Sequence, residues 1–275
     1  MFTGLMADAW IVGTVVAVVA GVLGFFVVLR GASFVAHAVP LSSFAGAAGA
    51  ALIGVSTLAG LGVFAPLSAL GIGWLGRRGR QDVATALSVA ALLGLGSLFL
   101  AWGTEYVAAT SALLFGSIVG VSAGEAWLTF GLGLTALAAV AVLFRWLLVT
   151  SLVPEMAAVR GVRPVAADTA FLVLLALVTT LAVPVVGALI MFPLTVGPPA
   201  AARSITAVPA RALALSVAMS LVTVWAGLAA AWTWSWPVGF VVGVVAAGWY
   251  AFGRVWAWLA ARRHLAAEVE VAPAA

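Results

Sequence analysis

Long apolar runs, separated by short polar intervals that contain arginine, dominate the chain. A membrane-spanning helix needs about 20 mostly apolar residues, and short flanks rich in arginine stay on the cytoplasmic side of a bilayer. Each interval between consecutive arginine clusters is long enough for two helices, one that crosses the bilayer outward and one that returns. The pattern predicts nine spans, near residues 8–29, 33–52, 54–76, 82–102, 125–147, 166–183, 187–203, 210–232 and 237–260.

The same rule predicts the orientation of the chain. With every arginine on the inner side, the N-terminus lies outside and the C-terminus lies in the cytoplasm. No lysine or arginine precedes the first apolar run, so we expect residues 8–29 to be a retained span and not a signal peptide. Trp232, Trp234 and Trp236 gather at an outer span end, which is typical of an aromatic belt at headgroup level.

Composition excludes a water-soluble fold. Hydrophobic residues make up 65% of the 275 residues and charged residues 7%, whereas soluble domains have roughly 25% charged residues. The fold class expected is therefore an all-α polytopic membrane protein, with a single transmembrane domain over residues 1–265 and a disordered cytoplasmic tail over 266–275. The predicted location is the plasma or inner membrane of a bacterium.

Residue types that are missing also limit the function. The net charge of +4 comes from arginines between apolar runs, which favours helix orientation over nucleic-acid binding. The chain has no cysteine, so thiolate metal sites are excluded. It has no lysine either, so it cannot form the lysine-containing loop that cradles ATP phosphates. Any ATP hydrolysis would belong to another chain, and no enzymatic activity is expected of this one.

Two segments depart from simple spans. Residues 107–121 are apolar but too short to cross, and they predict a re-entrant or surface helix on the outer side. Residues 187–203 contain three prolines, each of which removes a backbone donor. A broken backbone at membrane depth persists only where protein or a water-filled cavity satisfies it, so this segment is expected to face the bundle interior as a broken helix. Its marked residues are Pro193, Pro198, Pro199 and Arg203.

The longest polar interval, residues 151–164, predicts a short helix outside the bilayer. Pro154 suits the start of a helix, Glu155 its first turn, and Gly161 its end. One interpretation is a docking helix for a cytoplasmic partner, and the other is an ordinary amphipathic connector. The candidate docking residues are Pro154, Glu155, Met156, Ala157, Val159, Arg160 and Gly161.

Three segments together resemble the permease subunit of zinc/manganese-type ATP-binding-cassette importers. Leu23–Gly46 (LGFFVVLRGASFVAHAVPLSSFAG) is similar to the first two spans of that family, and Leu113–Ser122 (LLFGSIVGVS) to its outer LFG segment. The stretch from Val153 to Arg203 is similar to its docking loop followed by a GAL-to-PAATAR region. The resemblance covers nearly the whole chain.

The resemblance implies a set of partners. These are a second permease copy in a homodimer, cytoplasmic ATPase subunits that grip the loop around Glu155–Gly161, and an extracytoplasmic metal-binding protein. It also implies Zn or Mn as the transported substrate, with no permanently bound cofactor. An ATPase-independent channel or scaffold is the alternative function.

One position departs from the family pattern. The family carries an Asp and, four residues later, a His on one face of the second span, and here these positions are His37 and Leu41. His37 is the candidate metal contact, since neutral imidazole suits ions of the zinc and manganese kind. The alternatives are a hydrogen bond between His37 and a neighbouring helix, or a position of His37 near the cytoplasmic interface, roughly 10 Å in from Arg30. Asp168, early in the sixth span, is expected to pair with Arg163 or Arg160.

Overall fold

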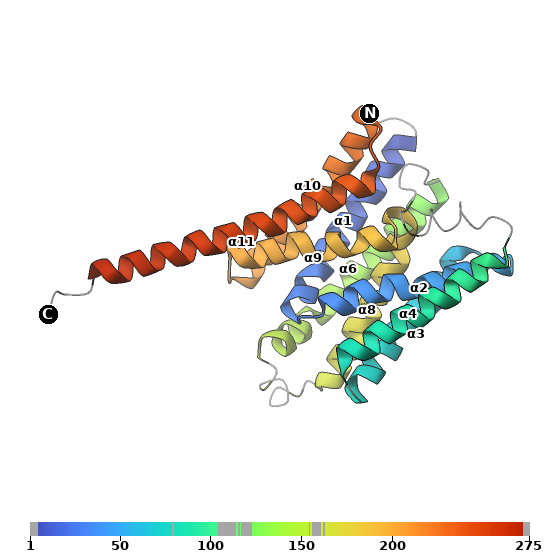
Figure 1. Ribbon diagram of the computed structural model, residues 1–275, viewed down its shortest axis with the longest axis horizontal. Helices are drawn as coiled ribbons and strands as arrows, with labels where there is room; N and C mark the ends of the chain where they lie inside the picture. Colours follow the sequence, from blue (N-terminus) through green and yellow to red (C-terminus); the bar gives the residue numbers. More distant parts are fainter. Residues whose placement is uncertain are drawn as a thin grey trace.

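The computed structural model describes residues 5–78, 80–103, 123–153 and 163–271, together with Leu114, Gly116, Glu155 and Gly161. Every regular element in this part of the chain is an α-helix, which confirms the predicted fold class (Figure 1). The helices are α1 (Leu5–Leu29), α2 (Ser33–Leu52), α3 (Thr57–Arg78), α4 (Gln81–Ala101), α6 (Ala123–Leu152), α8 (Pro164–Val186), α9 (Ala188–Ile205), α10 (Pro209–Trp234) and α11 (Val238–Val271).

Eight of the described helices are long and apolar enough to cross a membrane, and α9 is the exception. Burial divides them into two groups. In their most apolar stretches, 78% of the residues of α2 and 72% of those of α8 are buried, against 17% for α4 and 22% for α6. Helices α1, α2 and α8 therefore form the centre of the bundle, and lipid is the expected surrounding of the exposed apolar side chains on the outer helices.

Small residues bring the central helices close together. A Cβ on Gly21 of α1 would lie 2.8 Å from Val217 Cα of α10, so only glycine fits there. At the same contact the Ser216 hydroxyl donates a hydrogen bond of 2.6 Å to the Gly21 carbonyl. Without a hydrophobic driving force inside lipid, such close packing and interhelical hydrogen bonds hold membrane helices together.

The proline-rich segment is continuous in the structure. Pro193, Pro198 and Pro199 lie inside α9, so the break expected among them is not present there. The interruption lies instead at Gly187, where α8 gives way to α9 with φ of 89° and ψ of 152°. Ten of the 18 residues of α9 are buried, in agreement with a segment that faces the bundle interior.

A close helix contact explains how α9 tolerates its prolines. Pro199 has no N–H to donate to the carbonyl of Thr195 four residues earlier. That carbonyl faces α1 at Gly24, where a Cβ would meet Thr195 O and would lie 2.6 Å from Pro199 Cγ. The backbone of α1 at Gly24 thus lies against the carbonyl that the proline leaves free.

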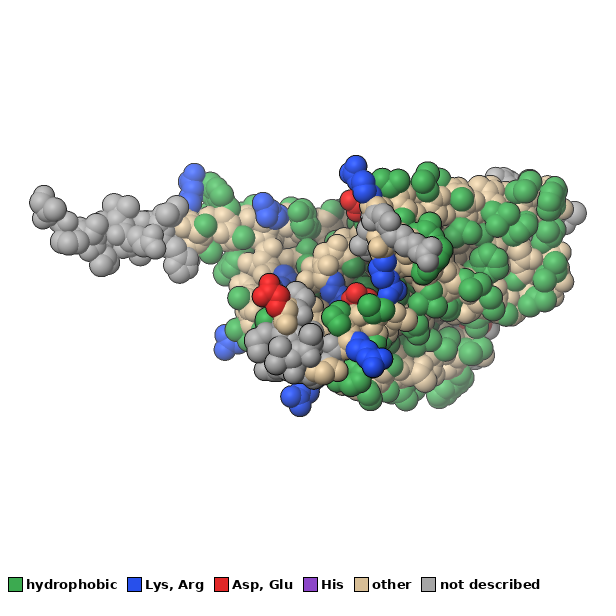
Figure 2. Space-filling model, turned by 90° about the horizontal axis from the view of Figure 1, so that it is seen from below, with side chains coloured by type: hydrophobic (Ala, Val, Ile, Leu, Met, Phe, Trp, Pro, Cys, Tyr) green, Lys and Arg blue, Asp and Glu red, His purple; other side chains and the backbone are tan. Residues whose placement is uncertain are grey.

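The described arginines gather at one end of the bundle. Figure 2, which views the molecule from below Figure 1, shows the basic side chains on this face. Trp74 of α3 and Trp146 of α6 are exposed near this end, and Trp127, at the start of α6, is exposed at the opposite end. Exposed tryptophans at both ends match the two aromatic belts of a membrane protein.

The C-terminal boundary of the domain stays a prediction. Helix α11 continues to Val271, so it extends into the stretch 266–275 that the sequence assigns to a disordered tail. Figure 1 shows the last turns of α11 projecting away from the other helices.

Candidate metal pathway and coupling end

His37 lies in the second turn of α2, facing α9. Its ring packs edge-on against Phe192, with 4.7 Å between ring centroids. The side chain is half-buried, and its Nδ1 atom is buried without a hydrogen-bond partner among the described residues. The interhelical hydrogen bond considered for His37 is therefore not observed at Nδ1. A neutral imidazole with an unused nitrogen retains the lone pair or proton through which it contacts a metal or water.

Leu41, one turn further along α2, is buried among apolar side chains. It is 6% exposed and lies in a cluster with Phe44, Leu61 and Leu100. Ala188 belongs to the same cluster and precedes Phe192 by one turn of α9. His37 and Leu41 therefore both face α9, and the second of the two positions contributes no ligand. Among the described residues, no group of three His, Cys, Asp or Glu side chains is placed to hold a metal ion.

Two described residues of the LFG segment contact this region. Most of residues 107–121 lies outside the described residues, but Leu114 packs against the cluster that contains Leu41. Gly116 has φ of +76°, and a Cβ there would lie 2.5 Å from Val185 O and 2.6 Å from Gly187 N. The glycine of the LFG segment thus sits directly against the interruption between α8 and α9.

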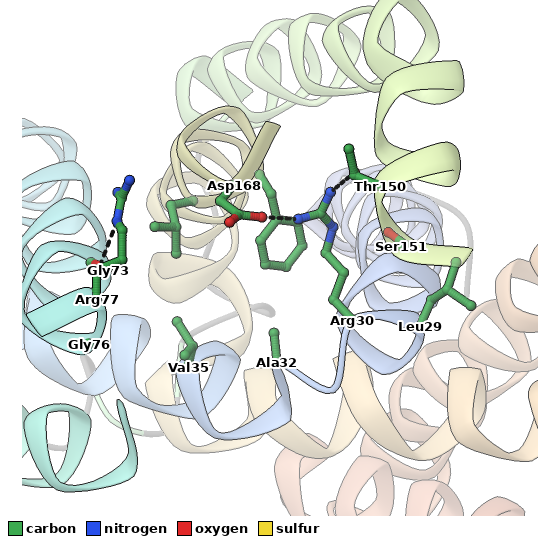
Figure 3. A pocket seen from close by; sticks show the side chains of 12 residues that line it. Leu29, Arg30, Ala32, Val35, Gly73, Gly76, Arg77, Thr150, Ser151 and Asp168 are labelled. Carbon is green, nitrogen blue, oxygen red and sulfur yellow. Dashed lines mark hydrogen bonds and ion pairs between the residues drawn. The ribbon is translucent and has the colours of Figure 1, made fainter. Parts of the chain in front are cut away.

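An ion pair occupies the arginine-rich end (Figure 3). Arg30, which follows α1, places Nη1 2.7 Å from Asp168 Oδ1 and donates from Nη2 to Thr150 Oγ1 of α6. Its side chain is 9% exposed, whereas that of Asp168 is 56% exposed. The expected pairing of Asp168 with Arg163 is wrong, and Arg160 lies outside the described residues. The partner that the structure describes is Arg30, because the end of α1 lies between α6 and α8.

Burial affects the pKa of the Arg30 side chain. Desolvation lowers the pKa of its guanidinium from the ordinary value, and the hydrogen bond and charge of Asp168 act in the opposite direction. The guanidinium carbon also lies 5.0 Å from the centroid of the Phe171 ring. Arg30 thus joins three helices through a carboxylate, a hydroxyl and an aromatic ring.

A pocket of about 410 Å³ opens beside this ion pair. Arg77 lies on the far side of the pocket from Arg30, and its Nε donates a 3.1 Å hydrogen bond to the Gly73 carbonyl (Figure 3). The pocket lining comes from α2, α3, α6, α8 and the end of α1: Leu29, Arg30, Ala32, Val35, Gly73, Gly76, Arg77, Thr150, Ser151, Asp168, Phe171 and Leu172.

The docking segment is described only in part. Glu155 is helical and exposed, and Gly161 has φ of 70°, a left-handed backbone of the kind that ends helices. The other docking candidates, Pro154, Met156, Ala157, Val159 and Arg160, lie outside the described residues. The segment connects α6 to α8, so both helices that flank it reach the ion pair of Arg30.

Helices that can cross a membrane, with charges gathered at one end, define the class of protein as a helical integral membrane protein, in which the half-buried His37 is the candidate pathway residue. The chain matches the model of the ABC 3 transport family over residues 3–256, and it therefore belongs to that family. This confirms the resemblance seen in the sequence.

Relatives agree with this assignment. The chain is 30% identical to the manganese import system permease protein ScaB of Streptococcus parasanguinis, over 72% of this chain and 71% of the relative. It is 28% identical to the manganese transport system membrane protein MntC of Listeria innocua, over 74% and 73%. The fold is similar to that of a chain in the solved structure of PsaBC from Streptococcus pneumoniae in complex with Fab, with a TM-score of 0.83 and 24% identity over 91% of both chains.

Proposed function

We propose that this chain is the permease subunit of an ATP-binding-cassette importer for a divalent metal cation of the manganese or zinc class. The family match and the relatives named as manganese permeases support the transport class and the cargo. The single observation that carries the metal proposal is His37, an ionisable side chain in the most buried of the described helices, whose Nδ1 has no hydrogen-bond partner among the described residues. An ionisable residue at membrane depth marks a transport pathway by default, because burying it is costly.

The chemistry of the pathway follows from the single imidazole. A neutral histidine is a good ligand for Zn and for ions of the manganese kind, but one side chain replaces only part of a hydration shell. Transport requires a cation to enter and also to leave, so binding has to be weak or shared among sites. His37 beside the aliphatic Leu41 suits brief contact with a partly hydrated cation.

The energy of ATP hydrolysis reaches the permease at its arginine-rich end. Separate cytoplasmic ATPase subunits hold the segment 151–164, and their closure moves α6 and α8, which flank it. Arg30 passes this movement to α1 through its contacts with Thr150 and Asp168. Alternating access follows from these motions, with no covalent chemistry in this chain. An external metal-binding protein delivers the cation, and a second copy of the permease completes the transporter.

The orientation is part of the proposal. The arginine-rich end faces the cytoplasm, the N-terminus lies outside, and the C-terminus lies inside. The chain has no cysteine, so single cysteines report accessibility directly. Arg80→Cys should react with a membrane-impermeant thiol reagent only in opened cells, and Trp234→Cys should react in intact cells. The reverse pattern contradicts the orientation.

Uptake of radioactive manganese and zinc by cells that express the transporter tests the pathway. His37→Ala should lower uptake to a small fraction of the wild-type rate at equal membrane abundance. His264→Ala, at the other of the two histidines, is the matched control and should transport normally. Unchanged uptake in His37→Ala removes this residue from the pathway.

Deleting residues 154–161 separates the importer from an ATPase-independent channel or scaffold. The importer loses uptake on deletion, since the motor no longer grips the permease, whereas a channel keeps it. If docking alone fails, the ATPase subunit no longer co-purifies with the deletion variant while the unfolding midpoint of the variant in detergent stays at the wild-type value; a lower midpoint would indicate failed folding.

A further inference from the structure

The pocket at the arginine-rich end has a net positive charge that has no role in the proposed transport cycle. Its charged lining residues are Arg30, Arg77 and Asp168, which leave a net charge of +1. The Arg30–Asp168 pair is the only ion pair found among the described residues, and it neutralises itself. Arg77 remains as the uncompensated cation, so the pocket favours an anion.

Donors for an anion are already in place. Arg77 uses Nε on the Gly73 carbonyl, which leaves both of its Nη groups without a partner among the described residues. On the opposite wall, Arg30 is nine-tenths buried and donates from Nη1 and Nη2 to Asp168 and Thr150, and its Nε is buried out of reach of a ligand. Arg77 is therefore the arginine of the pocket that can receive an anion. Guanidinium groups match the geometry of phosphate oxygens well.

The hydroxyls of the pocket are not available as donors. Thr150 donates to the Trp146 carbonyl at 2.8 Å, and Ser151 donates to the Leu147 carbonyl. The anion would therefore be held by the Nη groups of Arg77. This donor set suits a phosphate that carries one negative charge, equal to the excess charge of the pocket.

The rest of the lining favours a lipid over a free ion. Leu29, Val35, Phe171 and Leu172 contribute apolar surface to the same pocket. The volume of about 410 Å³ falls within the range of roughly 300–1,000 Å³ that holds whole small molecules. Exposed Trp74 lies three residues from Arg77 and exposed Trp146 four residues from Thr150, which places the pocket at headgroup depth.

We propose that this pocket binds the phosphate headgroup of an anionic phospholipid of the cytoplasmic leaflet, with the Nη groups of Arg77 on the phosphate and the apolar lining against the glycerol region. Basic pockets between membrane helices on this side of a bilayer recognise such headgroups. The bound lipid would rest against the ion pair that joins α1, α6 and α8, and so it would stabilise the arrangement of helices next to the docking segment.

Native mass spectrometry of the full-length chain, extracted from nanodiscs of phosphatidylglycerol and phosphatidylcholine, tests this site. The wild-type chain should retain phosphatidylglycerol in preference to phosphatidylcholine. Arg77→Gln should retain about fivefold less phosphatidylglycerol, as expected for the loss of one basic residue at a membrane surface. Arg77→Lys, which keeps the charge but not the planar fork, should fall between them.

Arg80→Gln is the matched control, because it removes the same charge three residues away and outside the pocket lining. It should retain phosphatidylglycerol as the wild type does. Equal retention by Arg77→Gln and wild type, or an equal loss in Arg80→Gln, would overturn the proposal. Excess inorganic phosphate should leave the lipid bound; displacement of the lipid by phosphate alone would assign the pocket to a free anion instead.

Discussion

Arg30 Nη1 lies 2.7 Å from Asp168 Oδ1, which joins the end of the first span to the second turn of α8. The same guanidinium holds Thr150 near the end of α6. The helices before and after the docking segment are thus tied to one side chain of α1. A movement of that segment that shifts α6 or α8 at this end therefore either carries α1 with it or strains these bonds.

Asp168→Asn tests the stabilising role of the ion pair. In this variant, Arg30 stays nearly buried but loses the carboxylate of its partner. The free energy of unfolding should fall by about 1.5–3 kcal/mol, the contribution of a hydrogen bond to a charged group. The thermal unfolding midpoint of the purified chain in detergent measures this. Asp82→Asn, at an exposed acid in the first turn of α4, should leave the midpoint nearly unchanged. Equal midpoints for Asp168→Asn and wild type would show that the pair is not stabilising.

Gly116→Ala should weaken the junction of α8 and α9. Its φ of +76° costs a residue with a Cβ about 1–2 kcal/mol. The added methyl would also press on the carbonyl of Val185, and overpacking of this kind costs about 1–3 kcal/mol. Loss of metal uptake and a lower unfolding midpoint are both expected. Gly124→Ala, where a Cβ meets nothing within 4 Å, is the control and should behave as the wild type.

The spans could be predicted from the sequence because lipid imposes a simple rule on each segment. Every backbone group has to be satisfied within a helix, so apolar length alone indicates where a crossing helix lies. The predicted span 33–52 coincides with α2, and the predicted span 210–232 falls within α10. The described arginines gather at one end for a similar reason, because the preference of arginine for the cytoplasmic side acts on each loop separately.

Relationships between distant segments could not be predicted in this way. Arg30 and Asp168 are 138 positions apart, and the sequence indicated only that each lies near the inner face. The nearest arginines in sequence were therefore the expected partners. The continuity of α9 was missed for a similar reason, since the carbonyl freed by Pro199 is covered by Gly24 of another helix.

Gly24→Ala tests that account of the prolines. The new methyl would meet the Thr195 carbonyl and Pro199, so α1 and α9 would have to separate. Stability should fall by about 1–3 kcal/mol, as for other overpacked sites. Gly71→Ala in α3, where nothing lies within 4 Å of the new Cβ, is the matched control. An unfolding midpoint for Gly24→Ala equal to that of Gly71→Ala would show that the close approach is not needed.

Leu41→His tests whether the face of α2 that carries His37 can bind a metal. The substitution places two imidazoles at i and i+4 on the face that packs toward α9. Without metal, a polar ring at a site 6% exposed should cost about 1–3 kcal/mol of stability. With zinc at a hundred times its dissociation constant, binding to the folded state should return about 2.7 kcal/mol.

The unfolding midpoint of Leu41→His should therefore rise with zinc far more than that of the wild type, which has one imidazole on this face. The double variant His37→Ala, Leu41→His should lose the effect, because a single ligand at either position binds weakly. If the double variant responds to zinc as strongly as Leu41→His, the two positions do not share a metal. A strong response that needs both rings would show that the wild-type chain keeps the metal-facing geometry of its family with half of the ligands, which favours rapid release over tight binding.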